Sequence, residues 1–187
     1  MEVLLMFYFH TCGTTNGRRF VEQNAPFLSQ ANGPKKWQWL SQGYYFWNDE
    51  DHYAHIWGKT SYNNDYAIIR CKINLNTNAI LDLVSNVTHC KYFQSLVLKY
   101  QEKIQRVNPT ESPTVSTVIE HYRKEAKRDY RLFPFEAIKA VDCCPSAPKL
   151  KFTPSAVNYM TQIPRIQLCL FASSHTAITS KEIYFFS

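Results

Sequence analysis

The order of strand-like and helix-like segments is the feature that most constrains the fold of this chain. Apolar, aromatic-rich runs typical of buried strands lie near one end, at residues 3–9 and 43–47, and near the other, at residues 166–171 and 183–186. Between them, residues 88–107 carry apolar side chains at helical spacing. Strands at both ends of a helical middle predict an α+β fold.

Shorter segments complete this outline. Tyr66 begins an alternating run in which Ala67, Ile69, Cys71 and Ile73 share one face, so we expect a half-buried strand over residues 66–73. Further elements are expected as helices at 18–24, 51–58 (capped by Asn48 and Asp49) and from Ser112-Pro113 to about 129, a strand at 79–84, a helix or strand at 135–141, and loops at 29–36 and 143–148.

The 187 residues suit one domain, and we expect residues 1–187 to form it, with a helical insert at about 88–131. The apolar share of 45% excludes a disordered chain. The run at residues 3–9 is too short to span a bilayer or to serve as a secretion signal, so we expect a cytoplasmic protein with no membrane partner.

The cysteines and the charge narrow the classes of site and partner. The six cysteines show no zinc-type spacing with each other or with histidine, so we expect reduced thiols and no metal site. The net charge of +6 favours an anionic partner, either nucleic acid or a phosphorylated ligand.

Three short motifs carry the candidate chemistry, and each lies at the edge of a predicted strand. His10, Thr11 and Cys12 follow the first strand. Tyr45 lies in the second, within a Gly-Tyr-Tyr-Phe-Trp run, and Glu182 precedes the last. A histidine at a strand end, a tyrosine in an aromatic strand or a glutamate beside a lysine is, taken alone, usually structural or solvated.

In this order the motifs resemble those of the ADP-ribosyltransferase superfamily, on its diphtheria-toxin and poly(ADP-ribose) polymerase side. That family carries His-Gly-Ser/Thr, then Gly-x-Gly-x-Tyr-Phe, then a Glu that opens a final apolar strand. The resemblance extends over nearly the whole chain, and the Trp-Leu before the second motif is more similar to prokaryotic toxins of phage-defence and toxin–antitoxin type. It implies two small antiparallel sheets around an NAD⁺ cleft with an inserted helical pair, and a mono-ADP-ribosyltransferase toxin held by a neutralising antitoxin.

The resemblance also implies residue roles. His10 would bond a ribose hydroxyl of NAD⁺, the backbone of Thr11 would clamp the nicotinamide amide, and Tyr45 would stack on the nicotinamide ring. Glu182 would bind the ribose 2′-hydroxyl. Breaking the glycosidic bond leaves a cation on the ribose, which a fixed carboxylate stabilises, so we expect Glu182→Gln to remove most turnover and spare NAD⁺ binding.

Further contacts and departures follow from the same comparison. Cys12 occupies the position of the family's Ser or Thr. Trp57 lies one residue after the position at which poly(ADP-ribose) polymerases carry a second stacking tyrosine. Arg18 is a candidate contact for the pyrophosphate. Ser180 replaces the Gln or Glu of arginine-modifying relatives, which argues against arginine as acceptor.

Nucleic acid is therefore the expected acceptor. Arg123, Lys127, Arg128 and Arg131 form a basic stretch on the second insert helix that would grip its phosphates, unless it is only a solvated face. Three alternatives remain open: a protein acceptor, water as acceptor in an NAD⁺ glycohydrolase, and a non-catalytic module that binds NAD⁺ or nucleic acid.

Overall fold

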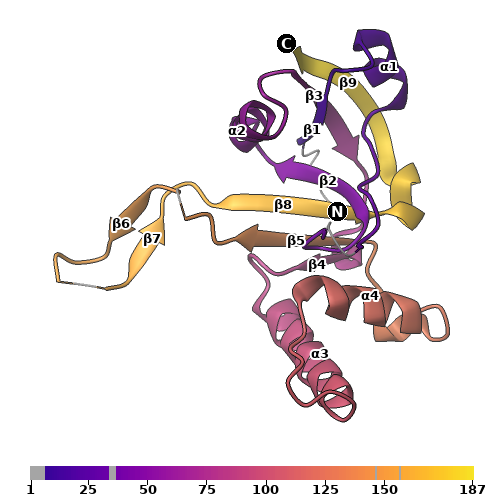
Figure 1. The fold of residues 1–187 in the computed structure, drawn as a ribbon, viewed down its shortest axis with the longest axis vertical. Helices are drawn as coiled ribbons and strands as arrows, with labels where there is room; N and C mark the ends of the chain where they lie inside the picture. The colour runs from indigo at the N-terminus through magenta and orange to yellow at the C-terminus, as the bar shows by residue number, and fades with distance from the viewer. Residues whose placement is uncertain (1–6, 34–36, 146, 156) are drawn as a thin grey trace.

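The computed structural model describes residues 7–33, 37–145, 147–155 and 157–187 (Figure 1). Within them the chain forms a seven-stranded sheet in the order β4-β5-β8-β2-β1-β3-β9, and a separate two-stranded sheet of β6 and β7. The strands of the large sheet are β1 (Phe7–Gly13), β2 (Gly43–Asn48), β3 (Tyr66–Ile73), β4 (Ile80–Asp82), β5 (Ala137–Asp142), β8 (Arg165–Phe171) and β9 (Ile178–Phe186). The small sheet consists of β6 (Lys149–Lys151) and β7 (Tyr159–Thr161).

This arrangement confirms the α+β class and corrects its details. The expected pair of small antiparallel sheets around a cleft is wrong, because Tyr8 and Phe9 of β1 pair with Asn48 and Trp47 of β2 and so join the two groups of strands into one sheet. All neighbours in that sheet are antiparallel except β4 and β5, which are parallel.

In the part of the chain that the structure describes, four α-helices flank the sheet, with short 3₁₀ turns η1, η2 and η3 between elements. Their bounds are α1 (Arg18–Asn24), α2 (His52–Ser61), α3 (Val87–Gln105) and α4 (Val115–Glu125), with η1 (Thr77–Ala79), η2 (Tyr130–Leu132) and η3 (Ala172–Ala177). Helices α3 and α4 lie together beyond the β4 edge of the sheet, whereas α1 and α2 lie near its β3–β9 end (Figure 1).

The helix starts depart from the expected caps. Helix α4 begins after Thr114, whose side chain and that of Thr117 form a reciprocal capping box, rather than at Ser112. Helix α2 begins after Asp51 without a side-chain cap, and Asp49 instead adopts a left-handed backbone at φ 66°. The expected cap by Asn48 and Asp49 is therefore wrong, because Asn48 ends β2 and Asp49 lies in the bend before the helix.

Alternation along the strands explains how the core divides. Ala67, Ile69 and Cys71 pack into one apolar cluster, which confirms the shared face predicted for β3, while Ile68 packs into another on the opposite face. A third cluster joins α3 and α4 to the sheet through Leu96, Ile119 and their neighbours.

Several expected boundaries shift. Strand β1 continues through residues 10–13 instead of ending at His10, and the expected strand residues 3–6 lie outside the described residues, as does part of the loop at 34–36. Strand β4 is shorter than expected and β9 is longer, and the β6–β7 hairpin, for which the sequence indicated no strands, follows the loop expected at 143–148. In the described residues, no helix combines the length and apolarity needed to cross a membrane.

Candidate ligand-binding cleft

The cleft forms where β1 and β2 separate. The two strands pair only through Tyr8↔Asn48 and Phe9↔Trp47 among the described residues, and beyond these β1 continues beside β3 while β2 continues beside β8. The edge of β1 beyond Phe9 thus faces open space instead of a neighbouring strand. A cleft of about 940 Å³ occupies that space, a volume at the upper end of the range for small-molecule and cofactor sites.

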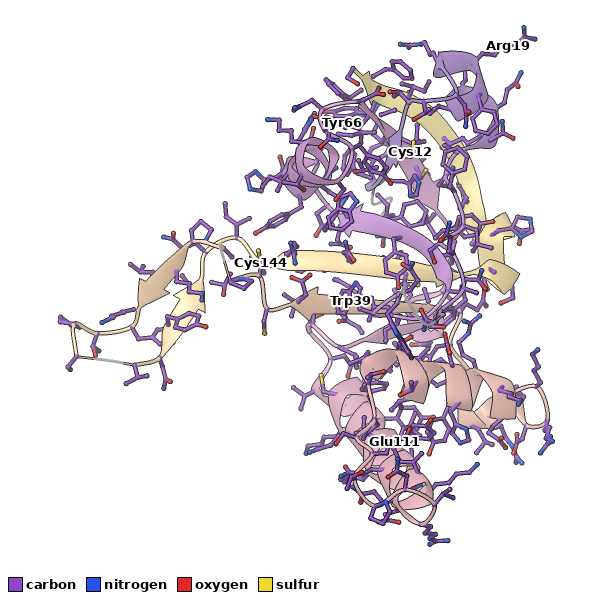
Figure 2. All side chains as sticks on the ribbon, in the orientation of Figure 1. Cys12, Arg19, Trp39, Tyr66, Glu111 and Cys144 are labelled. Atoms are coloured by element: carbon purple, nitrogen blue, oxygen red, sulfur yellow. The ribbon has the colours of Figure 1, made fainter. Side chains whose placement is uncertain are left out.

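Eight of the described aromatic residues line the cleft. Trp37, Trp39, Trp47 and Trp57 line it together with Tyr45, Tyr62, Phe20 and Phe27. The side chains of Figure 2 show how the cleft draws on distant segments: Cys12 comes from β1, and Trp39 from the loop before β2. A wall of this kind favours a flat, partly apolar ligand, because rings offer large stacking surfaces at little entropic cost.

His10 lines the cleft, but both of its ring nitrogens are already used. Nδ1 lies 2.9 Å from the carbonyl oxygen of Tyr45, which can only accept, so Nδ1 carries the proton and Nε2 accepts the N–H of Phe27 at 3.1 Å. Burial lowers the pKa of His10 to about 4, so the ring is neutral at pH 7. The expected bond to a ribose hydroxyl is therefore not available in this arrangement, and His10 instead ties β1 to β2 and to the loop after α1.

Tyr45 presents its ring to the cleft while its hydroxyl is held from behind. The hydroxyl donates to the Ser41 carbonyl at 2.8 Å and accepts the Leu40 N–H at 3.0 Å, and burial raises its pKa. Tyr45 therefore lines the cleft, and its stacking on nicotinamide stays a prediction. Gly43, in the same motif, has a packing reason: a Cβ there would lie 2.6 Å from the Leu170 carbonyl oxygen on β8.

The other three predicted contacts that line the cleft are Thr11, Cys12 and Trp57. The Thr11 hydroxyl donates to the Ala54 carbonyl at 3.0 Å and accepts from the Trp47 indole at 3.2 Å, so only its backbone remains for a ligand. Burial raises the pKa of the Cys12 thiol to about 11, which keeps it protonated. Trp57 is 43% exposed at the cleft wall, as a second stacking ring requires.

Glu182 does not reach the cleft, and the expectation that it meets His10 there is wrong. His10 pairs with Ile69, and Ile69 pairs with Ile183, so these three side chains share one face of the sheet. Glu182 pairs with Arg70 and therefore projects from the opposite face, two strands away from β1.

The surroundings of Glu182 agree with that register. Its carboxylate accepts from the Arg70 Nε at 2.6 Å, and the Glu182 side chain is 56% exposed. The Arg70 guanidinium in turn lies over the rings of Phe7 and Tyr184. This is a surface ion pair with an aromatic support.

Arg18 also lies away from the cleft. It packs over the Phe186 ring and, with Glu182 and Lys181, lines a separate hollow of about 260 Å³. The predicted pyrophosphate contact at Arg18 is wrong for the same reason as the carboxylate: both belong to the β9 side of the sheet.

The cleft contains polar residues that the motifs did not indicate. Gln167 on β8 accepts the Trp39 indole N–H at 2.9 Å, and Arg165, two residues earlier on the same face, binds Asp142 of β5 through Nε at 2.7 and 2.8 Å. The bond to Asp142 raises the pKa of Arg165. Arg165 and Gln167 alternate with apolar residues in β8, and that interruption of an apolar strand was the available signal.

The predicted basic stretch begins on α4 with Arg123 and continues past the end of that helix at Glu125, and it is only partly available to a nucleic acid. Arg123 is packed 3.9 Å from the centre of the Phe171 ring and donates to Ser41 Oγ at 3.2 Å, so it belongs to the core boundary. Arg131 is paired with Asp129, and Lys127 and Arg128 are exposed. The prediction that all four form one phosphate grip is wrong for Arg123.

Two further findings concern metals and disulfides at the site, and similarity to known proteins. Among the described residues, no group of three or more His, Cys, Asp or Glu side chains is placed to hold a metal ion, and none of the six cysteines, all of them described, forms a disulfide. No protein-family model matches the chain, and no curated protein or solved structure is significantly similar to it.

Proposed function

We propose that the cleft between β1 and β2 binds NAD⁺ and that the protein is an ADP-ribosyltransferase with a macromolecular acceptor, nucleic acid first. The observation that carries this proposal is the cleft itself, which places predicted contacts His10, Tyr45 and Trp57 around one space of about 940 Å³. That volume suits a dinucleotide, and its aromatic wall suits two flat bases.

The residues of the cleft divide the work of binding. Tyr45 and Trp57 offer rings on which the nicotinamide can stack. Stacking uses neither the hydroxyl of Tyr45 nor the indole N–H of Trp57. The unpaired edge of β1 at Thr11 offers backbone groups for an amide. His10 ties that edge to β2 through its bond to the Tyr45 carbonyl and to the loop after α1 through its bond from the Phe27 N–H, and so acts as a positioning residue.

Asp142 replaces Glu182 as the carboxylate of this proposal. Among the described residues that line the cleft, Asp142 is the carboxylate, and the bond to Arg165 holds it in a fixed orientation. A carboxylate so fixed stabilises the cationic ribose that forms as nicotinamide leaves, more than it stabilises the ground state.

A second function has a specific observation in its favour. Gln167, an uncharged residue, faces the cleft from the strand beside β2, and the charge of Asp142 is shared with Arg165. A cleft of this composition suits a module that binds NAD⁺ without cleaving it. Both functions predict that the cleft binds NAD⁺, but only the transferase predicts that NAD⁺ is cleaved.

One experiment separates them. The protein is incubated with NAD⁺ labelled on the adenylate phosphate and with RNA, DNA or protein pools in separate reactions, while calorimetry measures NAD⁺ affinity. The transferase predicts label in one pool, loss of labelling in Asp142→Asn with affinity retained, and normal labelling in the matched variant Glu182→Gln. Affinity without any NAD⁺ cleavage supports the binding module, free ADP-ribose alone supports a glycohydrolase, and no affinity refutes the proposal.

A further inference from the structure

The β6–β7 hairpin stands apart from the body of the protein. It forms its own two-stranded sheet and extends as an arm from the ends of β5 and β8 (Figure 1). All three residues of β6 and two of the three in β7 are exposed. An isolated two-stranded ribbon gains little stability alone, so a surface of this kind is suited to a partner.

The register divides the arm into two chemically different faces. Lys149 pairs with Thr161 and Lys151 pairs with Tyr159, so these four side chains share one face, here called the basic face. Leu150 and Met160 pair on the other face. The Lys149 ammonium lies over one side of the Tyr159 ring, 4.6 Å from its centre, so cation and ring are in contact on the basic face.

The charge of the arm selects the class of partner. Residues 143–164 contain two lysines and no Asp or Glu, so nothing within the segment neutralises the basic face. Tyr159 is 49% exposed and offers its ring to solvent. Lysines beside an exposed ring match the phosphates and bases of a single strand, whose unpaired bases can stack on aromatic side chains.

The arm begins and ends beside the cleft. Asp142 ends β5 and Arg165 begins β8, and these paired residues line the cleft while the arm runs between them. Cys144, labelled in Figure 2, marks the root. The Tyr53 hydroxyl of α2 donates to the Ile163 carbonyl at 2.6 Å and fixes the returning leg.

We propose that the basic face of the arm binds single-stranded nucleic acid, with Lys149 and Lys151 on the phosphates and Tyr159 stacked on a base. The site does not depend on NAD⁺ turnover. It extends the proposed function in one respect, because the arm that would hold the strand starts at Asp142 and returns at Arg165, which both line the cleft.

The test is fluorescence anisotropy of the full chain with labelled single-stranded RNA, single-stranded DNA and a duplex of the same sequence. Lys149→Gln with Lys151→Gln is expected to weaken single-strand binding about tenfold and to reduce the magnitude of the salt slope by about 1.4, the change for two lost phosphate contacts. Tyr159→Ala is expected to weaken it about fivefold or more with the slope unchanged. Lys99→Gln with Lys103→Gln removes the same charge from exposed positions on α3 and is the matched control.

Several outcomes would overturn the arm site. These are no binding of any strand, equal losses in the arm and α3 variants, or a duplex bound as tightly as a single strand. A Leu150→Ser variant that changes the oligomeric state, while the lysine variants change nothing, would assign the arm to a protein partner. Calorimetry with NAD⁺ on the arm variants keeps the two proposals apart, since affinity for NAD⁺ should be unchanged in them.

Discussion

Burial of His10 in its neutral form predicts a defined acid instability. The pKa of His10 is lowered from 6.5 to about 4 by burial, and both ring nitrogens are bonded in the neutral form. In the unfolded chain the ring takes up a proton below about pH 6.5. The unfolded state therefore binds more protons than the folded state between these values, so the contribution of His10 is complete above pH 6.5 and is lost as the pH falls towards 4.

The size of the effect follows from the two pKa values. At pH 5 the loss is about 2 kcal/mol, and the full loss is on the order of 3 kcal/mol. For a domain of this size, 2 kcal/mol corresponds to about 4–8 °C in Tm. Carboxylates also titrate at low pH, so the measured quantity is the difference between two proteins.

The assay is thermal and urea unfolding of the wild type and of His10→Gln from pH 7.5 to 4.5. Gln can accept at the position of Nε2 but cannot titrate, so the variant should be less stable at pH 7.5 and lose about 2 kcal/mol less than the wild type on acidification to pH 5. His52→Gln removes an exposed histidine and should follow the wild type. Parallel curves for the wild type and His10→Gln would show that His10 is not a buried neutral ring.

Three further changes test the surroundings of the cleft. Gly58→Ala would place its Cβ 2.2 Å from the Tyr66 ring, and we expect a loss of about 1–3 kcal/mol in urea unfolding. Tyr45→Phe removes two hydrogen bonds behind the cleft and keeps the ring, so stability should fall by about 1–2 kcal/mol with NAD⁺ affinity unchanged in calorimetry. Arg123→Met removes the cation packed on Phe171 and should lower Tm by several degrees, about 1–3 kcal/mol, without changing nucleic-acid affinity.

Each of these has a contrary outcome. Gly33→Ala, where a Cβ meets nothing within 4 Å, is the control for Gly58, and equal losses in both would contradict the steric explanation. A loss of NAD⁺ affinity in Tyr45→Phe would mean that the hydroxyl contacts the ligand. Weaker nucleic-acid binding in Arg123→Met at unchanged Tm would restore the α4 surface as the grip.

Local patterns in the sequence predicted the elements well. Helix α1 and strand β3 have the expected bounds. The strict alternation of apolar and other residues over 66–73 is compatible with a strand and not with a helix, and the short polar segment at 18–24 was bounded by turn residues. The hydrophobic period of a strand predicts which of its faces is buried, and the apolar cluster that contains Ile69 lies on the face so predicted.

The candidate site depended on information that is not local. Glu182 and Ile183 are adjacent in the sequence, yet one pairs with Arg70 and the other with Ile69, so a register change of one residue decides which face a carboxylate occupies. Asp142 reaches the cleft only because β5 lies beside β8, a pairing of segments distant in sequence. The arm was missed because its few strand residues are exposed on both faces and have no buried period.

The cleft exists because the backbones of β1 and β2 diverge, so its position is set by the main chain. Its walls would persist through many exchanges of the rings and amides that line it, because the strands are held apart by their other neighbours, β3 and β8. Selection, or a designer, can therefore change what this space recognises by altering side chains alone, with little risk to folding.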